Sequence, residues 1–314
     1  ADGQLDIVAD TEVQIATTTV DLNGALDVSG TATANSFETA AGGTFTTVSG
    51  NDLNIVYPNT RSLFFKEGST TTLTLDNAQG ATFAGAVAVA GDYSSTTSGT
   101  SNLRLGVNAG DSIASGGNYN VLLGDEAGTA ITTGDNNVAV GYAALDATTT
   151  ASSNTAVGYA ALGANTTGTR NAALGYQSGV ATTTATDNTY LGYAVGEALT
   201  TGGSNTLVGS KAGQSLTTGN SNVAIGVEAL DADTLGDRNV AIGNSALGSQ
   251  NFTSSTDAYN VAVGYTAGAS VTTGVQNTLV GSEAGDSFTD ADYNTGLGFR
   301  ALTTDTKGSR ATAL

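Results

Sequence analysis

The polar and apolar positions of residues 102–314 recur with a fixed period. Asn stands at twelve places, most of them 17 residues apart, with one spacing of 18 and one of 21. Four residues after each Asn there is a Gly, and the residue directly before that Gly is always Leu, Val or Ile. A fixed period of this length is the signature of a stacked repeat architecture. The twelve positions are Asn102, Asn120, Asn137, Asn154, Asn171, Asn188, Asn205, Asn222, Asn239, Asn260, Asn277 and Asn294.

Each unit begins with the pattern of a short strand, as in the Asn-Val-Ala-Ile-Gly of residues 222–226. Asn suits a corner because it tolerates left-handed backbone, and Gly serves where φ is positive or two backbones approach closely. We therefore expect one coil per unit, with two short strands, and about 4.8 Å between coils paired in parallel. The anchors of this β-solenoid are the pairs Asn137 and Gly141, Asn154 and Gly158, Asn222 and Gly226, and Asn239 and Gly243.

A second regularity concerns the core. Position +8, eight residues after the Asn, is always Gly or Leu. Position +11 is mostly a large apolar residue when +8 is Gly, as with Gly213 and Leu216, and is polar or small when +8 is Leu, as with Leu162 and Asn165. Well-packed interiors tolerate volume-conserving exchange and little else. The pattern predicts that +8 and +11 fill one core space from either side.

The repeat also predicts irregularities. The spacing of 21 adds four residues around positions 250–253, which we expect to form a bulging loop on one coil. Leu314 falls on the aliphatic position of a thirteenth unit, so we expect the native chain to continue beyond it. Residues 1–100 lack the period but alternate apolar and polar positions between Gly and Asn. They predict a β-rich fibrous stalk with a small knob around residues 50–80, where apolar residues are densest.

The composition excludes several classes of function. The net charge is −19, so nucleic acid is not an expected partner, because phosphate binding needs a basic surface. The chain has no His or Cys, which excludes the common transition-metal sites and His- or Cys-based nucleophilic triads. No run of 18 apolar residues occurs, so membrane insertion is not expected. We expect no cofactor and no enzymatic activity. Thin cores, and a stalk too poor in apolar residues to fold alone, predict a homotrimer.

The units at residues 154–162 and 239–243 resemble the head repeats of trimeric autotransporter adhesins and repeats of bacteriophage tail fibres. The Asp-Gly-Gln-Leu-Asp-Ile of residues 2–7 is similar to marine-phage fibre sequence. The resemblance implies a trimer of left-handed parallel β-rolls. The 17-residue unit is longer than that of the adhesin heads.

One aromatic column invites a functional interpretation. The residue after the invariant Gly is Tyr in four successive units, and it is aromatic again near the end. Such a stripe could stack on the sugar rings of a surface glycan. The structural alternatives, a stacking ladder or the seam of a trimer, are favoured because several units lack the aromatic residue. The tyrosines are Tyr142, Tyr159, Tyr176, Tyr193 and Tyr265.

Two further patterns suggest a function but have a simpler structural explanation. Thr pairs such as Thr132 and Thr133 suggest an ice-binding face, but adjacent residues of a strand point to opposite faces. Carboxylates such as Asp231 with Asp233, and Asp290 with Asp292, suggest a calcium site or a glycosidase pair. Solvated loop charges are the simpler interpretation, and a tailspike depolymerase stays a minor alternative.

The sequence therefore predicts a structural fibre shaft, and the resemblance to fibre repeats implies that it belongs to a phage tail fibre on a virion, where it holds a host-recognition end at a distance. Its expected partners are two further copies of the chain and other fibre or tail proteins, with a host surface glycan as a further candidate. The alternative is a bacterial surface adhesin or extracellular filament whose solenoid itself binds surfaces.

Overall fold

A computed structural model describes residues 66–67, 70–71 and 99–314. The chain divides into two units, Ala1–Ala84 and Gly85–Leu314. In the first unit, β1 (Lys66–Glu67) pairs antiparallel with β2 (Thr70–Thr71). The remaining predictions for the stalk and its knob fall outside the described residues.

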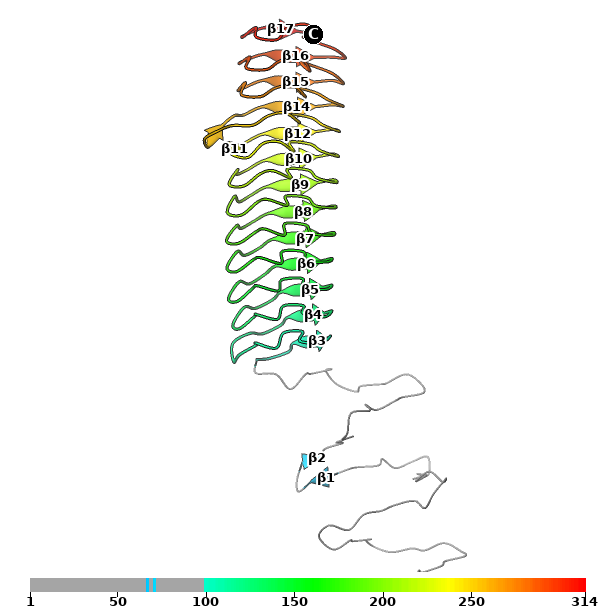
Figure 1. The fold of residues 1–314 in the computed structure, drawn as a ribbon, viewed down its shortest axis with the longest axis vertical. Coiled ribbons are helices and arrows are strands. Elements are labelled where there is room, and N and C mark those ends of the chain that lie inside the picture. Colours follow the sequence, from blue (N-terminus) through cyan, green and yellow to red (C-terminus); the bar gives the residue numbers. More distant parts are fainter. Residues whose placement is uncertain (1–65, 68–69, 72–98) are drawn as a thin grey trace, which may run out of the picture. The chain divides into compact units, whose positions relative to one another are not determined.

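Residues 99–314 form a parallel β-solenoid with no helix among them (Figure 1). Thirteen strands pair in one parallel sheet, each with the equivalent strand of the next coil, so that Val223 lies beside Val240. This confirms the predicted stack of about twelve 17-residue coils. The strands are β3 (Leu103–Leu105), β4 (Val121–Leu123), β5 (Val138–Val140), β6 (Thr155–Val157), β7 (Ala172–Leu174), β8 (Thr189–Leu191), β9 (Thr206–Val208), β10 (Val223–Ile225), β12 (Val240–Ile242), β14 (Val261–Val263), β15 (Thr278–Val280), β16 (Thr295–Leu297) and β17 (Thr312–Ala313).

The expectation of two strands per coil is wrong. Most coils contain one three-residue strand, and a second sheet consists only of β11 (Gly236–Asp237) and β13 (Thr256–Asp257), at the longer coil. Elsewhere the return path is made of turns, joined to the next coil by bonds such as that from Thr132 N to Thr149 O at 2.8 Å. Left-handed residues explain this, because Ala160 and Leu162 both have φ near 50° and interrupt extended backbone.

The repeated Asn residues form a continuous buried column. Asn154 Oδ1 accepts hydrogen bonds from the backbone N–H of Asn171 at 2.9 Å and from its side-chain Nδ2 at 3.2 Å. Asn154 Nδ2 donates to the carbonyl of Gly168, fourteen residues ahead in the same coil, at 2.9 Å. Most of these Asn residues thus join two coils and close their own, and no buried side-chain polar atom in the described part of the chain lacks a partner.

The invariant Gly residues form a second column in which a side chain has no room. Gly158 has φ +138°, and a Cβ there would lie 2.2 Å from the carbonyl oxygen of Gly175 in the next coil. Gly141, Gly226 and Gly243 meet the following coil in the same way, with corresponding distances of 2.6, 2.4 and 2.2 Å. Left-handed backbone and close approach both require Gly here.

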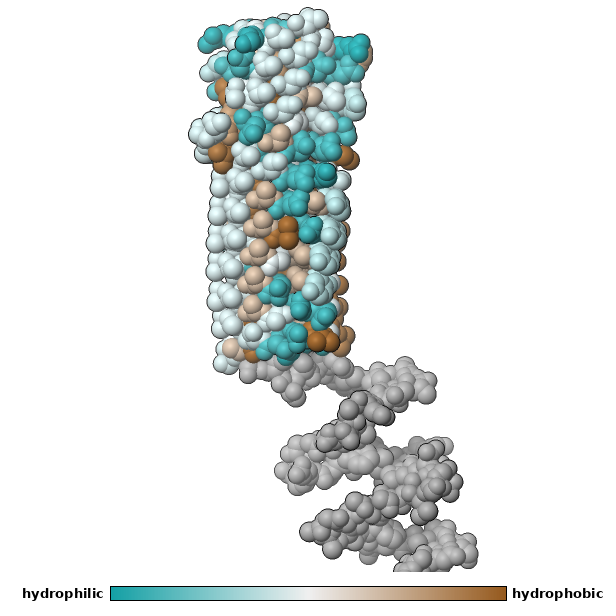
Figure 2. Space-filling view, viewed as in Figure 1, coloured by the Kyte–Doolittle hydropathy of each residue, from teal (hydrophilic) through white to brown (hydrophobic). Residues whose placement is uncertain are grey.

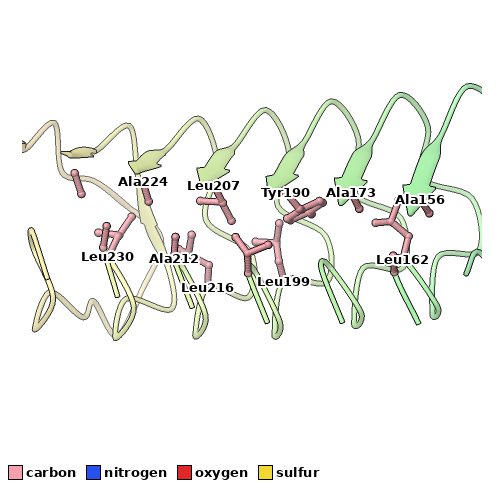
Figure 3. Close-up of a cluster of buried hydrophobic side chains, with 14 of the residues drawn as sticks. Ala156, Leu162, Ala173, Tyr190, Leu199, Leu207, Ala212, Leu216, Ala224 and Leu230 are labelled. Carbon is pink, nitrogen blue, oxygen red and sulfur yellow. The ribbon is translucent and has the colours of Figure 1, made fainter. Parts of the chain in front are cut away.

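The core lies between the strand row and the opposite side of each coil (Figure 3). Leu162 and Leu216 are both fully buried although they stand at +8 and +11 of their coils. A Cβ on Gly213 would lie 2.9 Å from Leu216 Cδ1 and 3.0 Å from Leu207 Cδ2. The two positions therefore share one space, as predicted, and the centre of the strand, position +2, contributes to it as well.

The size of the residue at +2 varies together with the residues at +8 and +11. Coils with Leu at +8 have Ala or Gly at the strand centre, as with Ala156 and Leu162. Coils with Gly at +8 carry larger residues there in several cases, such as Leu207 and Tyr190. The space is thus divided among three positions, since a close-packed interior fixes the volume of each layer.

At the longer coil, residues 239–259, the Asn column continues through the backbone N–H of Asn260, which donates to Asn239 Oδ1 at 3.2 Å, but the side-chain amide of Asn260 has a new partner. Asn260 Nδ2 donates to Gln250 Oε1 at 2.8 Å, and Gln250 Nε2 donates to Asp233 Oδ2 of the preceding coil at 2.6 Å. All three side chains are buried. The loop after Gln250 projects near β11 and β13 (Figure 1), as the four extra residues predicted.

Candidate functional site: the outer face of the sheet

The strands present an uncharged, mostly aliphatic face to solvent. Residues at +1 and +3 point away from the core, and in every strand of the thirteen-stranded sheet they are Val, Leu, Ile, Thr or Ala. Several are large and exposed, among them Leu105 at 51%, Leu174 at 50% and Leu297 at 49%. We call these side chains the outer face. A sheet that is apolar on both faces is typical of strands covered on both sides.

Charge is excluded from this outer face. The acidic residues recur instead on the turns, for example at position +9 in Asp111, Asp146, Glu197, Asp231 and Asp286. Figure 2 shows hydrophobic and hydrophilic residues gathered in bands that run along the solenoid axis. Large exposed aliphatic patches mark interaction sites in soluble proteins.

The outer face is not uniform along its length. Ala172 is the one small residue among the Val, Leu and Thr residues at +1. It lies in a shallow apolar depression of about 200 Å³, which is flanked by Thr155, Leu174, Thr189 and Leu191.

The predicted aromatic column borders the outer face on the side where the chain leaves each strand. We call this column, the residue after each invariant Gly, the trailing edge. Tyr142, Tyr159, Tyr176 and Tyr193 stack with ring centroids 5.4, 5.0 and 5.4 Å apart, whereas Tyr265 stands outside this ladder. A hydrogen bond with Glu126 raises the pKa of the Tyr142 hydroxyl.

Stacking determines what the ladder offers to a ligand. The faces of Tyr159 and Tyr176 lie against their neighbours, so their edges and hydroxyl groups remain for contact. A sugar that stacks on a ring face therefore has access only at the two ends of the ladder.

A second column borders the outer face where the chain approaches each strand. We call this column, the residue directly before each Asn, the leading edge; its residues are left-handed and mostly exposed. Arg238 lies over the ring of Tyr259, with Cζ 5.7 Å from the centroid, and Arg310 lies over Tyr293 at 5.1 Å. Arg170 pairs with Asp187 of the next coil at 2.6 Å and lowers the pKa of that carboxyl.

The Thr pairs divide between two roles. The first Thr is partly buried in most coils, and its hydroxyl donates to the next coil, as from Thr132 Oγ1 to Thr149 O at 3.0 Å. The second, such as Thr133, is exposed. One exposed column on a turn does not make the flat two-row array that the ice-binding interpretation needs.

The carboxylates highlighted by the sequence do not gather into one site. Asp233 is buried and accepts from Gln250 and from the backbone N–H of Gly236, which closes a turn. Asp290 pairs with Lys307 at 3.7 Å, and Asp292 accepts from Val275 N at 2.8 Å. Within residues 99–314 no group of three or more His, Cys, Asp or Glu side chains is arranged to hold a metal ion.

Sequence reasoning identified the aliphatic residue before each Gly but did not assign it to solvent. The strand centre is often Ala whereas the residue before the Gly is Val, Leu or Ile, but this pattern does not by itself decide which of the two faces solvent. In such strands the larger side chains point outward.

Comparison with known proteins does not add an identity. Among the described residues, no helix has the length and apolarity to span a membrane. No protein-family profile, curated protein or solved structure matches the chain.

Proposed function

We propose that this protein is a structural fibre shaft in which copies of the solenoid associate through their outer faces. The observation that carries the proposal is the outer face itself, which is uncharged in all thirteen strands of the sheet and has Val, Leu or Ile at +3 of every coil, beside Thr at +1 in six of the strands. Adjacent coils are also joined by three parallel sets of hydrogen bonds, in the strands, the Asn column and the Thr column. Such a solenoid resists bending and pulling along its length, because no single bond holds two coils together.

The period of the outer face favours a second copy of this chain as its partner. A partner that covers every coil needs the same rise per coil, and an identical solenoid provides it. Closed cyclic symmetry buries the same surface on every copy. Three copies, the number in the adhesins whose head repeats this chain resembles, would enclose the outer faces around one axis.

The biological setting follows from the resemblance to fibre repeats. We place the shaft in a phage tail fibre on the virion, between other tail proteins and a host-recognition end, with left-handed coils. The alternative is an adhesin or filament on a bacterial surface. Domains encoded together with this shaft distinguish the two settings, because a tail-attachment domain supports the first and a carboxy-terminal membrane anchor supports the second.

Two experiments test the assembly: a measurement of its mass, and the introduction of charged residues on the outer face. Light scattering at micromolar concentration should give three times the chain mass of 30.9 kDa. Val140→Lys together with Ile225→Lys should dissociate the assembly, because burying unpaired charge in an apolar contact is costly. Thr167→Lys on the exposed turn is the matched control and should leave the mass unchanged. A monomeric mass for the unaltered chain would refute the proposal.

A glycan-binding solenoid is the second candidate. Its support is the exposed Tyr ladder, restricted to ring edges and ladder ends. Replacing all four ladder tyrosines by Ala removes every ring face and hydroxyl group of the ladder, so loss of adhesion to glycan-coated surfaces, with an unchanged mass, would favour this function.

A further inference from the structure

We infer that the stacked tyrosine ladder is a site of oxidative modification, at which a haem peroxidase with hydrogen peroxide joins consecutive coils of one chain through dityrosine bonds. The ladder consists of Tyr142, Tyr159, Tyr176 and Tyr193. This modification goes beyond the proposed shaft function, and it does not depend on how many copies of the chain associate.

Tyrosine is the most easily oxidised side chain that this sequence contains. Residues 1–314 include 11 Tyr but no Cys, Met, Trp or His. Thiols and thioethers, which consume oxidants in many proteins, are therefore absent. Indole, the main competitor of phenol for one-electron oxidation, is absent as well. An oxidising equivalent that reaches the chain is thus directed to tyrosine.

The ladder holds its phenol rings in pairs that can couple. Consecutive ring centroids are 5.0–5.4 Å apart, and the planes of neighbouring rings differ by 11–21°. Coupling takes place at the carbons ortho to the hydroxyl group, which lie on the ring edge, and the four side chains are 45–53% exposed. In a near-parallel stack, equivalent carbons of neighbouring rings are separated by about the distance between the rings. Rotation about the side-chain bonds, which is fast in exposed residues, closes the remaining gap.

The other exposed tyrosines of residues 99–314 lack such a partner. Tyr259 and Tyr293 stand in one column, but Gln276 occupies the coil between them, so they are two coils or roughly 10 Å apart. Within the same range of residues, no ring is stacked on Tyr119 or Tyr265. The structure therefore predicts which tyrosines couple and which do not.

The reaction balances with hydrogen peroxide as the oxidant. The peroxidase removes one electron and the phenolic proton from each of two neighbouring tyrosines, and hydrogen peroxide takes up both electrons and both protons to give two water molecules. The two tyrosyl radicals then form a carbon–carbon bond between their ortho carbons. Each of these carbons gives up its hydrogen as a proton to the oxygen of its own ring, which restores two aromatic phenols. The chain loses two hydrogen atoms for each bond formed.

Each dityrosine bond fastens one coil to the next independently of the backbone. It closes a loop of 17 residues, which removes conformational freedom from the unfolded chain. The equilibrium population of the unfolded coils should fall by about 10- to 100-fold for each bond. Oxidation therefore stabilises the coils of residues 137–204.

Peptide mapping after oxidation tests the site. The purified protein is treated in dilute solution with a haem peroxidase and limiting hydrogen peroxide, and dityrosine is quantified by its fluorescence. Denaturing electrophoresis should show single chains, because the bonds join coils of one copy. A bond between Tyr159 and Tyr176 should link two tryptic peptides, since Arg170 lies between them.

Two double variants that keep the same number of tyrosines provide the comparison. Tyr159→Phe with Tyr193→Phe retains the aromatic rings but leaves ladder tyrosines two coils apart, so the dityrosine yield should fall by at least about tenfold. Tyr259→Phe with Tyr293→Phe is the matched control and should leave the yield unchanged. Circular dichroism confirms that both variants fold. Oxidation should raise the denaturation midpoint of the wild type and of the control, but not that of the ladder variant.

Three results would overturn the inference. Equal yields from the two double variants would show that coupling does not depend on the stack. Bonds that join two copies on the denaturing gel would place the reaction between chains instead of between coils. Absence of dityrosine from the oxidised wild type would exclude the modification itself. The shaft proposal is tested separately, by the mass of the assembly.

Discussion

The hydroxyl of Tyr190 lies 3.0 Å from that of Thr182, in the core of the preceding coil. That coil has the small residues Ala173 at +2, Gly179 at +8 and Thr182 at +11, so it cannot fill its own layer. The ring of Tyr190 supplies the missing volume, since a Cβ on Gly179 would lie 3.0 Å from Tyr190 Cε2. The one exception to the alternation of Gly and large residues is thus compensated by the next coil.

Tyr190→Phe should destabilise the solenoid by about 1–3 kcal/mol, because the buried Thr182 hydroxyl loses its partner. Adding Thr182→Val removes the unsatisfied group and should restore most of the loss. Chemical denaturation of the single and double variants measures this coupling. Tyr176→Phe, on the exposed ladder, is the control and should change stability little. Additive effects of the two core substitutions would contradict the finding.

Leu162→Gly should cost about 2–5 kcal/mol, because it empties a filled core space. Asn165→Leu on the same chain should refill that space from +11 and recover much of the loss. Conversely, Gly213→Leu should be destabilising, since Leu216 already occupies the space and φ at Gly213 is +56°. Thermal melting of the two single variants and the double variant gives the coupling energy, which should exceed the few tenths of a kcal/mol found for independent sites.

Asn154→Ala should weaken the solenoid locally by removing an acceptor and two donors from the Asn column. The backbone N–H of Asn171 then loses its partner, at a cost of about 1–3 kcal/mol. Hydrogen exchange should show the amide of Asn171 exchanging faster, while coils far from Asn154 keep their protection. Asn136→Ala, at an exposed corner of the neighbouring coil, is the matched control. Equal effects of the two substitutions would argue against the column.

Asp233 should make stability depend on pH. Burial raises the pKa of its carboxyl, although donors such as Gln250 oppose the shift. A raised pKa means that the folded chain holds the proton more tightly, so the contribution to stability is present below the unfolded pKa of about 3.9 and is lost as pH rises through the folded value. The melting temperature of the wild type, relative to that of Asp233→Asn, should therefore be highest at acid pH and should fall as the pH rises. A difference that grows with pH instead would contradict this sign.

Much of the fold was determined by local regularities of the sequence. The period of Asn and Gly predicted the parallel stack, because both residues serve backbone geometry that recurs in each coil. Some coils have Leu at +8, as with Leu162, and others have a large apolar residue at +11, as with Leu216. This exchange predicted a shared core space, because the volume of a packed layer is conserved. These features involve residues within one or two coils, and they can be recognised in the sequence because they recur at the same position of each repeat.

Two kinds of feature were determined only by the tertiary structure: the direction in which a side chain points, and the contacts between neighbouring coils. The turns at Ala160 and Leu162 replace a second strand, although neither residue type signals left-handed backbone. The stacking of Tyr142 on Tyr159 covers ring faces that a sequence pattern leaves open. The aliphatic residues at +3 are apolar whether they face the core or solvent, so composition did not reveal the outer face. The physical reason is that side-chain orientation is set by the closure of the whole coil, which the identity of one residue does not specify.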